Sequence, residues 1–203
     1  ENGGKGFSAT VEENAGGSSC ITAMNAENGD IFWKYKTRAS VKNTIATCCG
    51  LVFAQDVYGY LYAVDAESGK LKWEKKLDVV RVPGLNDGIV VSDDVVFAGS
   101  GKGLCAVDAM TGKELWKNDS WSQREGTTVT LSLSPDERVL ISGVQWGAMY
   151  ANDAVTGKLL WSRSENGIRN RASSPAIYQD GMFFLSLNSL FILSSRTGEL
   201  LLQ

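Results

Sequence analysis

Residues 106–116 read AVDAMTGKELW, and residues 151–161 read ANDAVTGKLLW. Similar stretches read AMNAENGDIFW at 23–33 and AVDAESGKLKW at 63–73, and a weaker fifth copy reads LSSRTGELLL at 193–202. The glycines of successive copies are separated by 40, 43, 45 and 41 residues. A motif that returns at a nearly constant period of this length indicates a repeat architecture, in which each copy forms one supersecondary unit.

Each copy contains short segments with the composition of β-strands. In the second copy these are residues 51–54, 60–64 and 71–74, with a weaker first segment at 43–47, and turns rich in Gly, Asp and Asn separate them. No stretch repeats apolar residues at helical spacing. A small antiparallel sheet cannot bury both of its faces alone, whereas radially stacked sheets cover one another. The sequence therefore predicts an all-β fold, a β-propeller of four-stranded antiparallel blades in a single region 1–203, with repeats at approximately 1–37, 38–77, 78–119, 120–164 and 165–203.

Three residue types of the motif are expected to have structural roles. The aspartate ends the third strand, where its carboxylate can accept hydrogen bonds from turn amides; these residues are Asp65, Asp108 and Asp153. The glycine supplies a positive φ in the following turn; these residues are Gly29, Gly69, Gly112, Gly157 and Gly198. The tryptophan offers a wide apolar face and one N–H to the seam between two blades; these residues are Trp33, Trp73, Trp116 and Trp161.

Composition excludes several classes of function. The chain of 203 residues has no histidine and a net charge of −3, which removes His-ligated zinc and Ser-His-Asp chemistry. The charges are mixed in sign, so we expect no nucleic-acid partner. No apolar run approaches the roughly 18 residues of a membrane helix, so no transmembrane segment is predicted. The first residues lack the apolar core of a signal peptide, which fits a mature secreted chain, a cytosolic chain or an excised domain.

The four cysteines fall into two groups. Cys20 and Cys105 lie in alternating apolar runs and are expected to be buried thiols. Cys48 and Cys49 are adjacent, and a disulfide between neighbours closes a strained ring. We therefore expect two free thiols at a turn, one facing in and one out. No CxxC spacing is present, so no metal site is expected.

The pattern at 106–116 and 151–161 resembles the tryptophan-docking repeat of the quinoprotein alcohol dehydrogenase-like propellers, also called PQQ-like repeats. That family includes pyrroloquinoline quinone (PQQ) dehydrogenases as well as members without a cofactor, such as the BamB-type outer-membrane assembly lipoprotein and accessory domains. In the enzymes a vicinal cysteine pair contacts the quinone beside a calcium held by Glu and Asn. Here Cys48 and Cys49 have a different local context, and no calcium constellation is recognisable. We therefore expect a non-catalytic, BamB-like or accessory member without cofactor, with PQQ and calcium as the alternative.

Five copies raise the question of how the ring closes. Propellers of this family usually have seven or eight blades, and the first and last copies here are degenerate. The chain is therefore either a small five-bladed ring or part of a larger propeller, and we favour the second. An open array leaves sheet edges that need cover, which additional blades or domains of a parent chain or self-association would supply.

Strand order assigns the loops to two faces. In a blade with strands A to D, the A–B and C–D turns share one face, and the B–C and D–A connections share the other. The second face carries the longer loops, which are the usual place for binding residues. Arginines recur there after each tryptophan, and aromatic residues accompany them. The candidate binding residues are Arg38, Arg81, Arg124, Arg169, Arg171, Tyr58, Trp121 and Trp146.

The arginines allow two interpretations. They can pack over aromatic residues and bond loop carbonyls, or they can form a cationic rim that binds carboxylates, phosphates or acidic segments. Three functions remain open: a scaffold that binds a protein or peptide partner, which we favour, a sensor for a small anion or sugar, and a fragment of a PQQ-dependent oxidoreductase. We expect an extracytoplasmic location, periplasmic or secreted.

Overall fold

The computed structural model describes residues 4–10, 18–42, 44–77, 88–100, 103–118, 129–144, 148–164, 174–186 and 189–203, without the side chains of residues 100, 103, 129 and 144. All regular elements in these ranges are strands, which form five antiparallel sheets in chain order. The all-β prediction is confirmed. No helix in the described part of the chain is long and apolar enough to cross a membrane.

Each sheet is built from consecutive strands. Sheet 1 contains β1 (Lys5–Ala9), β2 (Cys20–Asn25) and β3 (Ile31–Lys36). Sheet 2 contains β4 (Ala46–Cys48), β5 (Leu51–Gln55), β6 (Tyr60–Asp65) and β7 (Leu71–Lys76). Sheet 3 contains β8 (Ile89–Ser92), β9 (Val95–Ser100), β10 (Gly103–Asp108) and β11 (Glu114–Asn118). Sheet 4 contains β12 (Val129–Leu133), β13 (Val139–Val144), β14 (Met149–Asp153) and β15 (Leu159–Arg163). Sheet 5 contains β16 (Ala176–Tyr178), β17 (Gly181–Ser186), β18 (Ser189–Ser194) and β19 (Leu200–Leu202).

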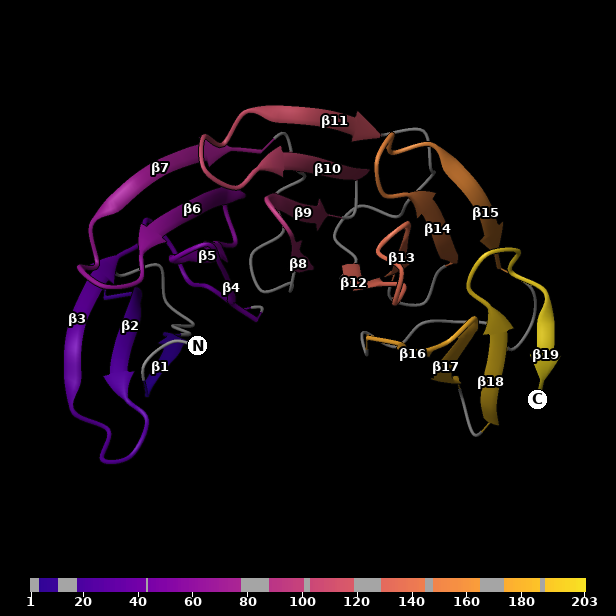
Figure 1. Cartoon of the computed structure of the whole chain (residues 1–203), viewed down its shortest axis with the longest axis horizontal. Coiled ribbons are helices and arrows are strands. Elements are labelled where there is room, and N and C mark those ends of the chain that lie inside the picture. The colour runs from indigo at the N-terminus through magenta and orange to yellow at the C-terminus, as the bar shows by residue number, and fades with distance from the viewer. Residues whose placement is uncertain are drawn as a thin grey trace.

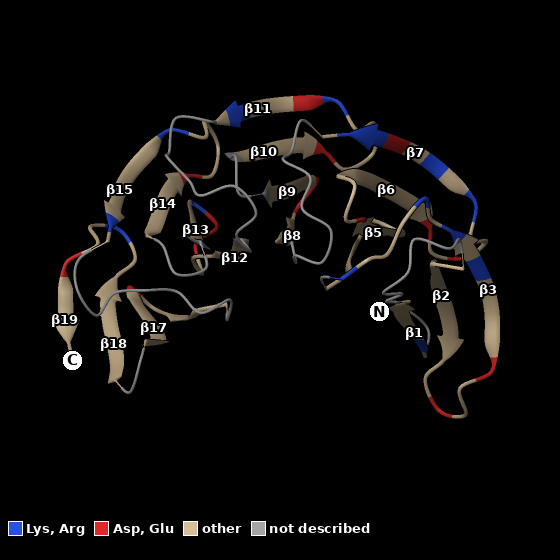
Figure 2. Ribbon diagram, turned by 180° about the vertical axis from the view of Figure 1, so that it is seen from behind, with Lys and Arg blue, Asp and Glu red and all other residues tan. Residues whose placement is uncertain are grey.

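The five sheets follow one another around an arc, with sheets 1 and 5 at its two ends (Figure 1). The last strand of each sheet lies on the outside of the arc, and the first strand lies toward its inside. Lys and Arg gather on the outer strands β3, β7 and β11 (Figure 2). Within its described residues sheet 1 has three strands, whereas the repeat predicts four.

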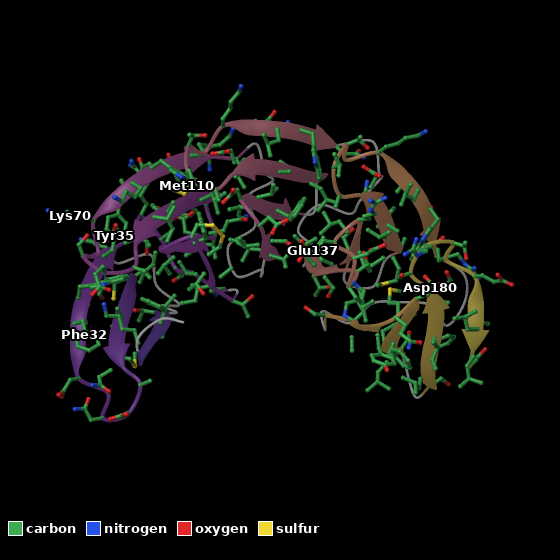
Figure 3. The ribbon with its side chains drawn as sticks, viewed as in Figure 1. Phe32, Tyr35, Lys70, Met110, Glu137 and Asp180 are labelled. Atoms are coloured by element: carbon green, nitrogen blue, oxygen red, sulfur yellow. A yellow bond between two sulfur atoms is a disulfide. The ribbon has the colours of Figure 1, made fainter. Side chains whose placement is uncertain are left out.

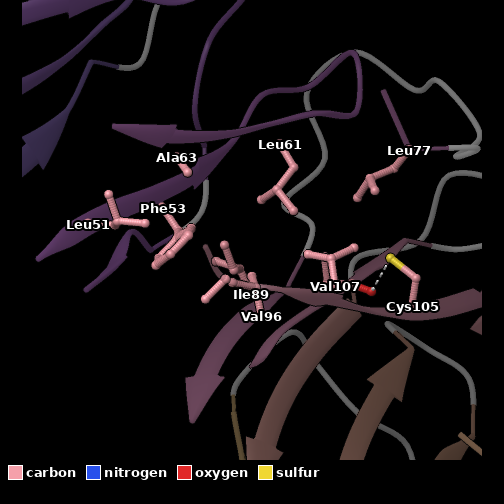
Figure 4. Close-up of a cluster of buried hydrophobic side chains, with 11 residues drawn as sticks. Leu51, Phe53, Leu61, Ala63, Leu77, Ile89, Val96, Cys105 and Val107 are labelled. Atoms are coloured by element: carbon pink, nitrogen blue, oxygen red, sulfur yellow. Dashed lines mark hydrogen bonds between the residues drawn. The ribbon is translucent and has the colours of Figure 1, made fainter. Parts of the chain in front are cut away.

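The core lies in the seams between sheets. The middle strands of sheets 2 to 4 are largely buried because a neighbouring sheet covers each face, and β5 is buried at all five positions. Between sheets 2 and 3, Leu51, Phe53 and Leu61 pack against Val96 and Val107 (Figure 4). Equivalent clusters fill the other three seams. Each fully buried large apolar side chain contributes about 1.5–3 kcal/mol, so the seams supply the main driving force for the arrangement.

The tryptophans connect successive sheets at these seams. The indole N–H donates to a backbone carbonyl of the next sheet's C–D turn, over 3.1 Å for Trp33 to Ala66 and 2.8 Å for Trp73 to Ala109. Trp116 and Trp161 make the same bond to Ala154 and Ser195, each at 2.9 Å. The backbone N–H of each accepting residue donates a hydrogen bond to a carbonyl oxygen in the A–B turn of its own sheet. These carbonyls belong to Gly50, Asp94, Arg138 and Asp180. The A–B and C–D turns therefore lie on the same face.

The glycine of the motif makes room for the indole. Gly69, Gly112, Gly157 and Gly198 have φ between 69° and 73°, and in each case an added Cβ would collide with the tryptophan of the preceding sheet. Gly29 has a φ of 78°, but no described atom lies within 4 Å of a Cβ added there. The aspartate carboxylates accept amide hydrogen bonds three residues on, at 2.8 Å from Ser68 and Thr111 and 2.7 Å from Thr156.

Candidate functional site

Two of the eight predicted binding residues, Arg38 and Tyr58, lie in the described part of the chain. The other six fall outside it: Arg81, Arg124, Arg169, Arg171, Trp121 and Trp146. The predicted face on the D–A and B–C side is therefore described only beside sheets 1 and 2.

Arg38 follows β3 and contacts sheet 2 through three groups. Its guanidinium donates to Glu74 on β7 at 2.5 Å and lies 4.7 Å from the ring centroid of Tyr60. Its backbone N–H donates to the hydroxyl of Tyr62 over 3.1 Å. Glu74, the acidic partner of Arg38, is 36 residues away in the sequence. At this position the observed contacts are those of a link between two sheets.

Tyr58 belongs to a turn organised by a buried carboxylate. Asp56, which is 1% exposed, accepts hydrogen bonds from the backbone N–H groups of Tyr58 at 2.9 Å and Tyr60 at 3.0 Å. The hydroxyl of Tyr62 donates to the second carboxylate oxygen of Asp56 over 2.7 Å. Burial raises the pKa of Tyr62, and the neighbouring carboxylate raises it further. The network fixes the β5–β6 turn beside Arg38.

A groove opens on the opposite face, between sheets 3 and 4. Its cavity has a volume of about 340 Å³. Phe97, Leu115 and Trp116 come from sheet 3, and Ala154 and Val155 come from the C–D turn of sheet 4. Leu115 is 50% exposed and Val155 is 77% exposed. This groove was not predicted, because its residues belong to two adjacent repeats and each one looks like an ordinary turn or strand position in the sequence.

Charged residues of the A–B turns border the groove. Asp93 borders it on sheet 3, and Asp136, Glu137 and Arg138 border it on sheet 4. Figure 3 labels Glu137 together with Asp180, which occupies the A–B turn of sheet 5. A hydrogen bond from the Ser134 hydroxyl lowers the pKa of Asp136, so this carboxylate is ionised at neutral pH. Three acids and one arginine give the border a net negative charge.

The next seam, between sheets 4 and 5, has a polar cavity of about 300 Å³ in the corresponding place. Arg196 in the C–D turn of sheet 5 reaches across it, and its guanidinium lies 2.6 Å from Asp136 and 3.8 Å from Asp180. Val155 and Met110 occupy the same turn position in sheets 4 and 3, and neither carries a charge. The groove beside Val155 is therefore apolar at the place where its neighbour is occupied by a guanidinium.

The cysteines differ from the sequence-based expectation. Cys48 and Cys49 form a disulfide at the A–B turn of sheet 2, so the prediction of free thiols was wrong. Cys49 has a left-handed conformation in this turn, with φ 55°. Cys105 is a buried thiol as expected, whereas Cys20 is half-buried, because β2 belongs to the first sheet and no preceding sheet covers its other face in the arc.

The described residues do not fit the calcium and quinone site of the related enzymes. In the described part of the chain, the one group of three or more potential metal ligands consists of Cys48, Cys49 and Asp94. Ca²⁺ takes six to eight oxygen ligands, whereas this group offers two sulfurs and one carboxylate. The pair also lies on the A–B side, away from Arg38 and the predicted funnel face.

Comparison with known proteins places the chain in a family. Residues 5–201 match the family described as outer membrane protein assembly factor BamB. BamB of Burkholderia pseudomallei is 27% identical over 157 residues, which cover 70% of this chain and 39% of that protein. Quinohemoprotein alcohol dehydrogenase ADH IIB of Pseudomonas putida is 31% identical over 159 residues, covering 70% of this chain and 23% of the enzyme. The chain thus spans well under half the length of these curated relatives.

Solved structures share the fold. BamB from Moraxella catarrhalis aligns with a TM-score of 0.72 at 16% identity, over 96% of this chain and 62% of that one. A europium-containing methanol dehydrogenase aligns with a TM-score of 0.75 at 16% identity, over 98% of this chain and 48% of that one. The propeller prediction is confirmed, and the relatives include both dehydrogenases and BamB proteins. The chain belongs to the BamB family of PQQ-type propeller repeats.

Proposed function

We propose that this region is a non-catalytic propeller scaffold that binds an extended segment of a partner protein in the groove between sheets 3 and 4. The observation that carries the proposal is the groove itself, in which Phe97, Leu115 and Trp116 meet the exposed side chain of Val155. Aromatic and aliphatic residues in a concave site are typical anchors of binding energy. The match to the BamB family supports a scaffold or binding role.

The chemistry of the groove defines the segment that it accepts. An apolar side chain of the ligand fills the floor beside Trp116, and a basic side chain next to it faces Asp93 and Glu137. The neighbouring seam supports this choice, because there Arg196 contacts Asp136 and Asp180. Charge pairs at an exposed border are screened by salt, so the affinity falls as ionic strength rises.

The opposite face stays part of the proposal as a second contact surface. Arg81, Arg124, Arg169 and Arg171, together with Trp121 and Trp146, are proposed to bind an acidic segment or a small anion there; a sugar sensor is the related alternative. An extracytoplasmic location is proposed as well, supported by the assembly factor of the outer membrane among the relatives.

A pair of matched variants tests the groove. Val155→Arg places a bulky cation over the floor, whereas Met110→Arg makes the same change at the equivalent, 54% exposed position of sheet 3 (Figure 3), which does not border the groove. Fluorescently labelled peptides that alternate apolar and basic residues are titrated against both variants and against the unchanged protein. We expect Val155→Arg to weaken binding at least tenfold, about 1.4 kcal/mol, and Met110→Arg to leave it unchanged.

Two outcomes would contradict the proposal. Acidic peptides of the same apolar content could bind as well as the basic ones, which would remove the role of the acidic border. The Val155→Arg variant could also bind like the unchanged protein, which would place the contact elsewhere. A melting temperature measured for each variant separates loss of binding from loss of folding.

A PQQ-dependent oxidoreductase is the second candidate, and the dehydrogenase relatives favour it. Adding PQQ and calcium to the purified chain and recording the visible absorption tests it. A saturable spectral change would support the enzyme, whereas a spectrum equal to the sum of the parts would support the scaffold.

A further inference from the structure

We propose that Cys48, Cys49 and Asp94 form a binding site for a thiophilic divalent cation of the Zn²⁺ class when the disulfide is reduced. The site joins the A–B turn of sheet 2 to the A–B turn of sheet 3. It lies outside the groove and does not depend on the proposed function. The sequence alone predicts no metal here, because the carboxylate is 45 residues away from its cysteine partner.

The donor atoms already lie close together. One atom from each of the three side chains lies within 4.8 Å of the other two. The sulfur of Cys49 is 3.2 Å from a carboxylate oxygen of Asp94. A tetrahedral ion with metal–sulfur bonds of about 2.3 Å and metal–oxygen bonds of about 2.1 Å holds its ligand atoms roughly 3.5–4 Å apart. Small side-chain rotations are therefore sufficient to seat the ion.

The backbone holds both turns in place. The carbonyl of Gly50 accepts a 2.9 Å hydrogen bond from the amide of Ala66, and the carbonyl of Asp94 accepts one of 2.8 Å from the amide of Ala109. The carbonyl oxygen of Asp93 lies 2.7 Å from the sulfur of Cys48, so the pair faces the next sheet. Cys49 and Asp94 are exposed, which leaves a position open for water and a path for the ion.

The repeat supplies an independent argument. Counted from the A–B turns, Cys48 and Asp94 at the seam between sheets 2 and 3 correspond to Asp136 and Asp180 at the seam between sheets 4 and 5. There the guanidinium of Arg196 lies between the two carboxylates, at 2.6 Å and 3.8 Å. At the first seam the residue equivalent to Arg196 is the uncharged Met110. The same place in the fold thus holds the guanidinium cation in the seam between sheets 4 and 5. In the seam between sheets 2 and 3 it holds potential ligands for a metal cation.

A dithiol can reduce the disulfide between Cys48 and Cys49. The dithiol transfers two electrons and two protons to the disulfide, which gives two thiols, and becomes a cyclic disulfide itself. Binding of the divalent cation then releases the two thiol protons, because the thiolate is the metal ligand. The bound ion adds a link between sheets 2 and 3. A ligand that binds only the folded state raises the melting temperature.

The test compares reduced and oxidised protein with Cd²⁺ and Zn²⁺ as probes. The full chain is reduced with a dithiol, freed from it by gel filtration without oxygen, and titrated with Cd²⁺ while the sulfur-to-metal charge-transfer absorption is recorded. Zn²⁺ is titrated by calorimetry in buffers of different ionisation enthalpy, which measures the protons released. We expect one equivalent of metal, about two protons per ion, and a higher melting temperature. The oxidised protein should show none of these.

Variants identify the ligands. Changing both Cys48 and Cys49 to serine should abolish the charge-transfer absorption. Because Cys20 and Cys105 are present in every variant, the difference in absorption between the unchanged protein and the double serine variant comes from the Cys48–Cys49 pair alone. Asp94→Asn should weaken binding by at least about tenfold. Asp93→Asn is the matched control, because it removes the same charge one residue away, and asparagine tolerates the left-handed φ of 46° at this position.

The proposal is overturned if the reduced protein binds no more metal than the double serine variant, or if the oxidised protein binds equally well. If Asp94→Asn and Asp93→Asn weaken metal binding equally, Asp94 acts only by general electrostatic attraction and is not a ligand. Far-ultraviolet circular dichroism of every variant shows that the fold is retained.

Discussion

Replacing Gly112 with alanine tests how the tryptophans connect the sheets. Gly112 has a φ of 69°, and a Cβ built there lies 2.8 Å from Cδ2 and 2.9 Å from Cε3 of the Trp73 indole. Carbon atoms in contact normally stay about 3.5 Å apart or more. The indole must therefore move away, and its 2.8 Å hydrogen bond to the carbonyl of Ala109 is stretched or lost.

Gly29→Ala is the matched control for this change. Gly29 has the same place in the motif and a φ of 78°, but no described atom lies within 4 Å of its added Cβ. Its cost is the left-handed conformation alone, about 1–2 kcal/mol for a residue with a Cβ. Gly112→Ala has the same conformational cost and in addition loses a hydrogen bond, about 1 kcal/mol, and part of the indole packing. Complete removal of a buried tryptophan costs about 3–5 kcal/mol, and Trp73 is half-buried and stays in place, so we expect a total of about 2–4 kcal/mol.

The measurement is urea unfolding followed by circular dichroism for both variants, alone and in a Trp73→Ala background. With the indole removed, the cost of Gly112→Ala should fall to that of Gly29→Ala, because only the backbone conformation remains. The reasoning is refuted if the two glycine variants lose the same free energy of unfolding in the presence of Trp73. It is also refuted if removing Trp73 leaves the cost of Gly112→Ala unchanged.

Three further outcomes follow from single side chains. Tyr62→Phe removes the donor to the buried carboxylate of Asp56 and should cost about 1.5–3 kcal/mol in urea unfolding; an unchanged midpoint would show that water replaces the hydroxyl. Hydrogen bonds from the hydroxyl and the amide of Thr111 lower the pKa of Asp108 in the folded protein. The ionised carboxylate therefore stabilises the fold fully above about pH 4, the pKa in the unfolded chain, and this stabilisation is lost as the pH falls through the folded-state pKa. Between about pH 5 and pH 2 the melting temperature of the unchanged protein should therefore drop more steeply than that of Asp108→Asn, and parallel curves would contradict this. Burial raises the pKa of Cys105 to about 11, so a thiol reagent near neutral pH should label Cys20 first in the unreduced protein, and fast labelling of Cys105 would show that its seam opens.

The described residues on the two faces of the arc make different kinds of contact. On the D–A and B–C side, Arg38 is paired with Glu74 and packed over Tyr60, which favours the structural interpretation at that one position. On the A–B side the turns of sheets 3, 4 and 5 contain acidic residues, and the groove and the cysteine pair both lie there. Binding experiments that vary salt and the sign of the ligand's charge therefore distinguish the faces as well as the ligands.

Local sequence determined the sheet architecture and the turns of this protein. The Asp-x-x-Thr-Gly pattern acts within five residues, because the carboxylate of Asp108 reaches the amide of Thr111 and Gly112 alone adopts the left-handed φ without strain. Short segments with the composition of β-strands are set by local sequence as well. The repeat period of about 43 residues then predicts a series of stacked antiparallel sheets, and the structure confirms this prediction.

Only the tertiary structure decided which side chains meet across a seam. Arg38 and Glu74 are 36 residues apart, and Cys49 and Asp94 are 45 apart, so each pair spans about one repeat. The groove between sheets 3 and 4 and the site between sheets 2 and 3 arise in the same way. Their residues become neighbours because adjacent sheets are rotated and offset relative to each other, and that offset depends on how whole faces of apolar side chains interdigitate. No pattern within one repeat contains this information.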